Sequence, residues 1–328
     1  MRIAPSVRRW LAGPRSDPSV RARFWTEVDG KTRHDPEVRT ALRAVGQTGW
    51  AASLLETQLP DGGWGAPGAS TLHVVRPRFV STHWISIVLA DLGMTRADPR
   101  IRKAAGVLLE WRRKVLEDKD GELCFAGNAT RTLIRFGYLD HPVVQASIAW
   151  LVDAQKADGG WTCYRRSRSG NLDGWEGLAA LAEIPEDSRD ESVRRAIQQG
   201  AEFYLKRRLM EAPGSAYAPW FRIHYPNHFY YDLLVGLRIL TRLGYGNDRR
   251  LGAALEWLRS KRRRDGTWAL DGVHPVTDIG DGVYLLRQPV FPLMLESLQV
   301  SSQWATVEAL GVLSLVAAHG LGTSGAPQ

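Results

Sequence analysis

Apolar and polar positions alternate along the chain in a pattern that predicts pairs of helices. Residues 81–94, STHWISIVLADLGM, are apolar almost all the way round a helix, as in a helix buried on every side. Residues 98–111, DPRIRKAAGVLLEW, combine apolar positions at helical spacing with a charged opposite face. The same order returns at 128–155 and 228–260, and residues 301–322 start a further apolar helix. We expect the first helix of each pair to lie inside and the second outside.

A short turn recurs between these helix pairs. The segments ETQLPDGGWGAP (56–67) and DAQKADGGWTCY (153–164) share a Gln followed by Asp-Gly-Gly-Trp. RSKRRRDGTWAL (259–270) keeps Asp-Gly and Trp, with Lys261 near the Gln position, and EDKDGELCFAG (117–127) is a weaker copy. Glycine permits a left-handed turn after a helix, Asp bonds local backbone N–H groups, and Gln and Trp reach neighbouring turns. Copies at intervals of roughly 40 to 60 residues indicate stacked supersecondary units.

Repeated Q-x-x-D-G-x-W turns on paired helices resemble the prenyltransferase/squalene-cyclase repeat superfamily, which includes terpene cyclases and the β subunits of protein prenyltransferases. The resemblance covers roughly residues 35 to 318. It implies an all-α fold, an α/α toroid whose inner helices ring a central cavity and whose outer helices surround them. We expect a helical N-terminal extension over 1–34, a single toroid over 35–320 and a tail over 321–328. The resemblance also implies an isoprenoid or other hydrophobic lipid substrate, although a fold does not fix a function.

The resemblance favours an isoprenoid-processing enzyme, and first an atypical terpene cyclase with an apolar, aromatic central cavity. Cyclases of this superfamily protonate an alkene or epoxide with an Asp of a D-x-D-D motif, which this sequence lacks. The nearest approach, DIGDG with Asp278 and Asp281, has another spacing and is typical of a loop. Two alternatives stay open: prenyl transfer from an allylic diphosphate, and a non-catalytic toroid that binds a lipid or isoprenoid.

Candidate reactive residues cluster at the predicted starts of inner helices. Asp232 lies four residues after His228, on the same helical face, so it would orient that imidazole. With Asp173, these are the candidate catalytic residues, acting as acid or base if burial shifts their pKa. Aromatic faces there would stabilise a carbocation, although an ordinary aromatic core is the alternative. The candidate substrate-binding residues at these starts are His83, Trp84, Trp175, Tyr231 and Trp304.

A metal site is implied only in part. In the prenyltransferase β subunits, Asp, Cys and His bind zinc near the starts of inner helices. RRSRSGNLDGWEGLAAL (165–181) resembles the segment with the Asp and Cys, but only Asp173 matches, because Trp175 stands at the Cys position. His228 matches the His, and Cys163 on another turn would complete a Cys/His/Asp set. Zinc or magnesium is therefore a candidate cofactor, and helix-capping or pocket-lining roles are the alternative.

Three arginines precede the inner helix expected near residue 173. In the prenyltransferases a similarly placed basic pair holds the substrate diphosphate, and guanidinium groups beside a helix N-terminus form a good oxyanion site. The alternative is a solvated, arginine-rich turn. These candidate substrate-binding residues are Arg165, Arg166 and Arg168.

Composition limits the partners and the cellular location that we expect. The net charge is +8 and the pI about 9.7, but the basic residues are scattered and no nucleic-acid module accompanies them, so we expect neither a nucleic-acid partner nor an obligate protein partner. The sequence has no secretory signal and no run of about 18 apolar residues. Two cysteines are too few for a disulfide framework, which favours the cytoplasm. A basic rim would allow peripheral contact with anionic lipid.

Overall fold

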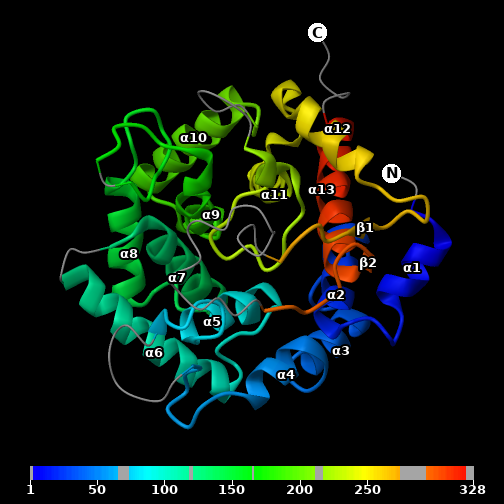
Figure 1. The fold of residues 1–328 in the computed structure, drawn as a ribbon, viewed down its shortest axis with the longest axis horizontal. Coiled ribbons are helices and arrows are strands. Elements are labelled where there is room, and N and C mark those ends of the chain that lie inside the picture. The colour runs from blue at the N-terminus through cyan, green and yellow to red at the C-terminus, as the bar shows by residue number, and fades with distance from the viewer. Residues whose placement is uncertain are drawn as a thin grey trace.

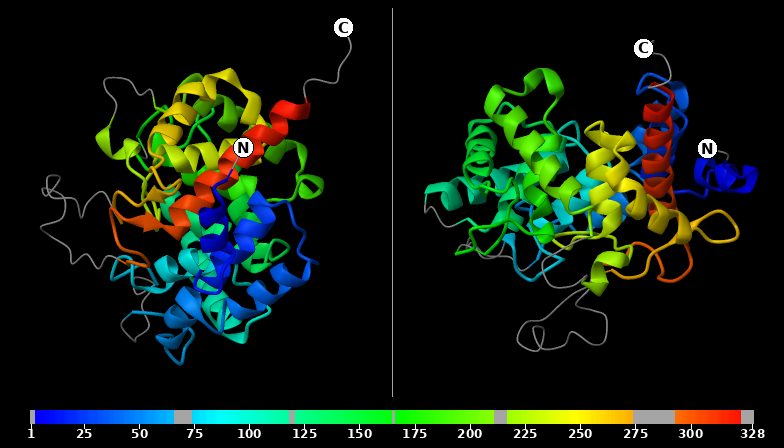
Figure 2. Two further views of the ribbon diagram at one scale, coloured as in Figure 1. Left: turned by 90° about the vertical axis from the view of Figure 1, so that its right-hand side faces the viewer. Right: turned by 90° about the horizontal axis from the view of Figure 1, so that it is seen from above.

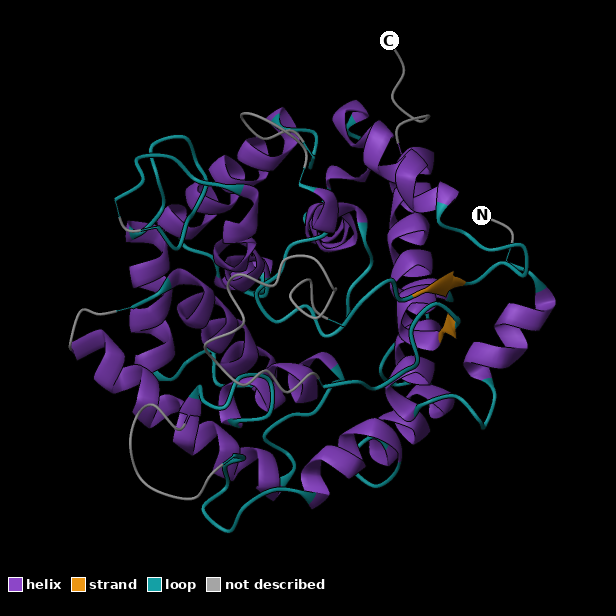
Figure 3. Ribbon diagram, viewed as in Figure 1, coloured by secondary structure: helices purple, strands orange, loops and turns teal. Residues whose placement is uncertain are grey.

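The computed structural model describes residues 3–65, 74–117, 121–164, 166–210, 217–273 and 293–322. These residues form an all-α toroid, seen down its axis in Figure 1 and coloured by secondary structure in Figure 3. Within them, the only strands are β1 (Trp268–Ala269) and β2 (Ser301–Ser302), which pair antiparallel. The predicted fold class is therefore confirmed.

The inner helices ring the axis, and each contacts the next one along the chain. They are buried on nearly every side, as their apolar sequences predict; every residue from Thr82 to Ala90 is buried, for example. The inner helices are α5 (Thr82–Asp91), α7 (Leu123–Phe136), α9 (Trp175–Ala182), α11 (Leu233–Arg242) and α13 (Gln303–Gly322).

The outer helices surround this ring (Figures 1 and 2). The longer ones carry charged residues that face solvent, such as Arg194 and Arg195. Four of them pair with the preceding inner helix as antiparallel neighbours in the predicted hairpins, α6 with α5, α8 with α7, α10 with α9 and α12 with α11. Short 3-10 turns, η3 to η7, lie in the connections. The bounds are α4 (Gly49–Glu56), α6 (Pro99–Glu117), α8 (Pro142–Asp153), α10 (Glu191–Lys206), α12 (Gly252–Ser260), η3 (Leu172–Gly174), η4 (Glu186–Ser188), η5 (Ala218–Phe221), η6 (Tyr245–Asn247) and η7 (Arg249–Leu251).

The N-terminal segment packs against the last inner helix. Asp17 caps α2 by accepting a 2.9 Å hydrogen bond from the amide of Ser19, and its own amide donates to Gln303 at the start of α13. Both α2 and the π-helical turn η1 contact α13 and α3. Residues 18–28 therefore lie beside the inner ring, and a domain boundary at residue 34 stays a prediction. The elements are α1 (Pro5–Ala12), α2 (Pro18–Arg23), η1 (Phe24–Val28) and α3 (Pro36–Ala44).

The repeated turns have the structural role that their residues predict. Gly62, Gly159 and Gly266 have φ near +90°, the left-handed region. The indole N–H of the turn Trp donates to a carbonyl ten residues earlier, at 2.8–2.9 Å in all three copies. Each turn thus fastens the end of an outer helix to the connection that follows it.

The turn glutamines join successive repeats. The amide of Gln58 donates to Gly62 O within its turn and to Arg100 O in α6, at 2.8 and 2.9 Å. Gln155 repeats the arrangement with Gly159 O and with Ala196 O in α10, at the same distances. The predicted bond between neighbouring units is therefore present in both glutamine copies. Among the described residues, no helix is long and apolar enough to cross a membrane.

Candidate functional site

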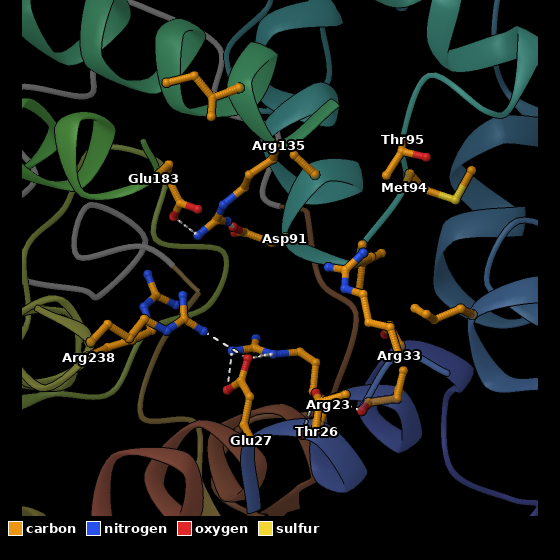
Figure 4. Close-up of a pocket in the computed structure, with 18 of the residues that line it drawn as sticks. Arg23, Thr26, Glu27, Arg33, Asp91, Met94, Thr95, Arg135, Glu183 and Arg238 are labelled. Atoms are coloured by element: carbon orange, nitrogen blue, oxygen red, sulfur yellow. Dashed lines mark hydrogen bonds and ion pairs between the residues drawn. The ribbon is translucent and has the colours of Figure 1, made fainter. Parts of the chain in front are cut away.

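A cavity of about 710 Å³ opens where the inner helices end (Figure 4). Its walls come from α2 and η1 and from the C-terminal ends of α5, α7, α9 and α11. Six lining side chains are cationic and three are carboxylates, a difference of three. The apolar aromatic cavity expected at the helix starts is therefore wrong for this space, whose lining is charged and partly aliphatic. The charged lining residues are Arg23, Lys31, Arg33, Arg135, Arg238, Arg242, Glu27, Asp91 and Glu183.

One carboxylate behind the cavity joins two inner helices to the N-terminal segment. Glu308 of α13 is 3% exposed and accepts hydrogen bonds from Arg23 and, at 3.0 Å, from Arg238. Burial alone raises the pKa of Glu308, but the two guanidinium groups outweigh it and hold the pKa well below its usual value. Glu27 adds bonds from Arg23 at 3.0 and 3.1 Å and from Arg242 at 2.8 Å. The lowered pKa values of Glu308 and Glu27 keep both carboxylates ionised at neutral pH.

Arg135 closes the opposite wall by bridging Asp91, at the end of α5, and Glu183, just after α9. Burial raises the pKa of Glu183, but Arg135 outweighs it, so the pKa lies at about 2. The nearby Arg131 is 2% exposed; burial lowers its pKa to about 10, and its guanidinium lies over the ring of Trp175 at 5.1 Å. Cations suit this place because each helix C-terminus carries about half a negative charge.

Arg33 differs from the other arginines of the cavity. It is exposed, its guanidinium reaches the cavity across from Arg238, and it makes no ion pair with any residue that the structure describes. The aliphatic part of the lining includes Leu42, Leu92 and Met94. A ligand with an anionic group and a hydrophobic chain matches such a surface.

At the starts of the inner helices the ring is filled by aromatic side chains. The ring of His83 contacts Trp84 and Phe125 at centroid distances of 4.8 and 5.3 Å. His228 stacks on Phe79 at 5.0 Å and meets Trp84 edge-on at 5.2 Å. His83, Trp84 and His228 thus lie together in a packed cluster that we call the aromatic centre, and their role in substrate binding stays a prediction.

Both histidines of the aromatic centre are uncharged at neutral pH. Each is 1% exposed, and burial lowers its pKa to about 3. Neither ring nitrogen of His83 has a hydrogen-bond partner, nor has Nε2 of His228. The backbone carbonyl of His228 accepts a 2.6 Å bond from the amide of Asn128 in α7, which ties the residue to the ring.

The expected pairing of His228 with Asp232 on one helical face is wrong. Helix α11 begins at Leu233, so His228 lies in the preceding loop, where its φ is +38°. Asp232 is the N-cap of α11 and accepts from the amide of Val235 at 2.9 Å. Its second oxygen accepts from the amide of His224, whose Nδ1 lies 3.4 Å away. The imidazole beside Asp232 is therefore that of His224.

The remaining aromatic candidates have structural partners. The hydroxyl of Tyr231 donates to Leu209 O at 2.8 Å, and Trp304 stacks on Tyr225 with 4.1 Å between centroids. Trp175 is fully buried at the start of α9, and its indole nitrogen has no partner. All three lie in the core, and Trp175 directly precedes Glu176, a buried carboxyl group described below.

The expected metal and diphosphate sites are not assembled. Asp173 is exposed and accepts a 2.9 Å bond from the indole of Trp220, whereas His228 lies among aromatic rings. In the described part of the chain, no three His, Cys, Asp or Glu residues are grouped to hold a metal ion. Arg166 and Arg168 are exposed and do not line the cavity. Arg165, Asp278 and Asp281 lie outside the described residues.

The most unusual carboxyl group was missed in the sequence. Glu176, one residue after Trp175, is 1% exposed, and neither of its side-chain oxygens has a hydrogen-bond partner. It packs against α7 so closely that a Cβ on Gly127 would approach its own Cβ at 2.6 Å. The available signal was a single charged residue at the start of WEGLAALA, an otherwise apolar inner helix.

No family model matches the chain, and no curated protein matches it. Among solved structures, it is similar to a type II terpene cyclase from Scytonema in complex with its substrate, geranylgeranyl dihydroxybenzoate. The match covers 82% of this chain and 95% of that chain at 16% identity, with a TM-score of 0.27. We therefore base the function on the residues of this chain.

Proposed function

We propose that this chain is an isoprenoid-processing enzyme, an atypical terpene cyclase in which Glu176 takes the place of the missing acid motif. The observation that carries the proposal is the burial of Glu176 with both carboxyl oxygens unpartnered. Burial first, and then the charge of Cys163, raise the pKa of Glu176 well above its usual value, so the group keeps its proton at neutral pH. A desolvated, protonated carboxyl group is the donor that alkene protonation requires.

The surroundings of Glu176 suit a cationic intermediate. Trp175 precedes it, and the aromatic centre lies at the same end of the inner ring, because Gly127 touches Glu176 while the adjacent Asn128 holds His228. Aromatic faces stabilise a carbocation through their quadrupole. The neutral imidazole of His228, whose Nε2 has no hydrogen-bond partner among the described residues, is a suitable acceptor for the proton lost when the cation collapses.

The arginine-lined cavity supplies a place for a polar head group. Glu176 does not line that cavity, which lies at the other end of the same helices. Glu183 does line it, and a separation of seven positions along the helix from Glu176 to Glu183 corresponds to about 10 Å. An isoprenoid chain extended along the inner ring would place its anionic end among the arginines and an alkene near Glu176.

Product analysis tests the role of Glu176. We expect cyclic products from squalene or geranylgeranyl diphosphate, detected by gas chromatography with mass spectrometry. Glu176→Gln keeps the size of the side chain but removes the acid, and should lower the rate by about 100-fold or more. Glu256→Gln, an exposed change on outer helix α12, is the matched control and should retain the rate. Full activity in Glu176→Gln would overturn the proposal.

The cavity itself favours a second candidate, binding or transfer of an isoprenoid diphosphate without cyclisation. The observation is the excess of cationic over anionic side chains around a space of about 710 Å³. Calorimetric titration with farnesyl diphosphate and with farnesol separates the candidates. Tight binding of the diphosphate alone, unchanged in Glu176→Gln and without turnover of any prenyl substrate, would favour a binding protein.

A further inference from the structure

The two cysteines of the chain, 39 residues apart, meet at the start of α7. The backbone amide of Cys124 donates a 3.2 Å hydrogen bond to the sulfur of Cys163. Cys163 follows the second Asp-Gly-Gly-Trp turn, and Cys124 is the second residue of α7, a helix of 14 residues. Both side chains are half-buried and free, so small reagents reach them.

The surroundings shift the pKa values of the two thiols in opposite directions. The interaction with the Cys124 side chain lowers the pKa of Cys163, and the hydrogen bond from the Cys124 amide at the helix N-terminus adds to this effect. The same interaction, followed by burial, raises the pKa of Cys124. Two carboxyl groups face the pair: Glu122, whose Oε2 lies 3.9 Å from the Cys124 sulfur, and the protonated Glu176. The pair is thus asymmetric, with the lower thiol pKa on Cys163 and the higher one on Cys124.

We propose that Cys163 is a peroxide-reactive thiolate and that Cys124 resolves its oxidised form into an intramolecular disulfide. The Cys163 thiolate attacks one oxygen of hydrogen peroxide, the O–O bond breaks, and hydroxide leaves to give a sulfenic acid and, after protonation, water. The Cys124 sulfur then attacks the Cys163 sulfur, the S–S bond forms and a second water leaves with the proton of Cys124. Two electrons pass from the cysteine pair to one peroxide.

Oxidation of Cys163 makes it easier for Cys124 to lose its proton and attack the oxidised sulfur. While Cys163 is a thiolate, its charge holds the proton on Cys124. Conversion to the neutral sulfenic acid removes that charge, and the Glu122 carboxylate beside the Cys124 sulfur is positioned to accept the proton. The disulfide would join the start of α7 to the loop that leads into η3 and α9. This site borders the proposed acid, since the charge of Cys163 contributes to the raised pKa of Glu176, but the proposal for the cysteines does not depend on isoprenoid turnover.

Mass spectrometry of the full chain tests the proposal. After one equivalent of hydrogen peroxide, the wild type should lose two hydrogen masses and become resistant to iodoacetamide, and dithiothreitol should restore both. In Cys124→Ser, Cys163 should accumulate as a sulfenic acid that dimedone traps. In Cys163→Ser, the remaining thiol should react with iodoacetamide at pH 7 about tenfold more slowly than Cys163 does in Cys124→Ser.

Controls keep the outcomes distinguishable. Cys124→Ser/Cys163→Ser is the blank for both reagents, and circular dichroism checks that each variant is folded. Equal iodoacetamide rates at the two cysteines in folded single variants would overturn the assignment of the thiolate. A wild type that forms only disulfide-linked dimers would overturn the resolving step, and a folded Cys124→Ser variant without a dimedone adduct would overturn the peroxide step. Cyclase activity does not enter any of these readouts.

Discussion

Both ends of the inner ring hold ionisable groups away from solvent, but the two ends leave them in opposite charge states. At the helix starts, the ring nitrogens of His83, Nε2 of His228 and the carboxyl oxygens of Glu176 have no hydrogen-bond partner among the described residues, and burial favours the neutral form of all three. At the helix ends, Glu308 and Glu183 are held by arginines and stay ionised. Burial therefore does not decide the charge of a side chain; the presence of an opposite charge within reach does.

The difference fits the separate tasks proposed for the two ends. A proton donor must keep its proton at neutral pH, which requires burial without a cation beside it. An anion site must keep its guanidinium groups charged and fixed, which the shared carboxylates achieve. The environment of the helix ends would not suit the acid, because an ionised Glu176 could not protonate an alkene.

Removal of Glu308 should have the largest effect on stability. Glu308→Ala leaves Arg238 buried without a partner among the described residues, and Arg23 with Glu27 alone. Breaking a buried ion pair by removing one member costs about 3–5 kcal/mol, to be measured as the free energy of unfolding in urea at pH 7. The matched control is Glu37→Ala, which removes a solvent-exposed pair with Lys31 and should leave the free energy of unfolding nearly unchanged.

The pH dependence of this loss identifies its cause. The folded pKa of Glu308 is lowered, so its stabilising contribution is present above the unfolded pKa of about 4.5 and disappears as the pH falls through the folded value. The difference between wild type and Glu308→Ala should therefore shrink below pH 4.5. A difference that stays constant down to pH 3 would mean that lost packing, rather than lost charge, destabilises the variant.

Substitution in the aromatic centre should have a smaller effect, with a distinctive pH dependence. The folded pKa of His83 is depressed to about 3 from a usual 6.5, so the wild type loses stability as the pH falls below 6.5, where the unfolded chain takes up a proton. His83→Phe cannot take up that proton. Its stability relative to wild type should therefore rise by about 1.4 kcal/mol for each pH unit between 6.5 and 4.

Unfolding of both proteins at pH 7 and pH 5 provides the test. Phenylalanine suits the site because neither ring nitrogen of His83 has a partner and its neighbours are Trp84, Trp111 and Phe125. The exposed His34→Phe is the control and should show no such trend. A His83→Phe curve parallel to that of the wild type would show that His83 is protonated in the folded protein.

Local features of the fold were predictable from the sequence, because their causes lie within one repeat. Gly62, Gly159, Gln58 and Gln155 act within their own turn and on the next outer helix, so their spacing predicted both the turn and the bond between units. The buried inner helices followed in the same way from their uniformly apolar sequences.

The chemistry of the ring depends on contacts that no local pattern carries. Arg23 and Glu308 are 285 residues apart and meet only because α2 packs against α13. The pairing of His228 with Asp232 failed because spacing of four assumes a continuous helix, whereas Asp232 ends the loop as a cap. Glu176 escaped notice because its significance lies in missing partners, and a missing partner leaves no trace in a sequence.

Arg33→Gln should have the smallest effect on the stability of the protein. It therefore tests ligand binding in the arginine-lined cavity separately from folding. Arg33 is exposed and makes no ion pair with any described residue, so its loss should alter the free energy of unfolding by less than about 0.5 kcal/mol. If the cavity binds the diphosphate of an isoprenoid, the same change should weaken farnesyl diphosphate binding by about tenfold, a loss of about 1.4 kcal/mol in calorimetric titration.

Arg195→Gln, an exposed change on outer helix α10, should leave both quantities unchanged. Weaker binding in both variants would indicate a general effect of net charge, whereas unchanged binding in Arg33→Gln would leave the arginines as partners of Asp91, Glu183, Glu27 and Glu308 alone.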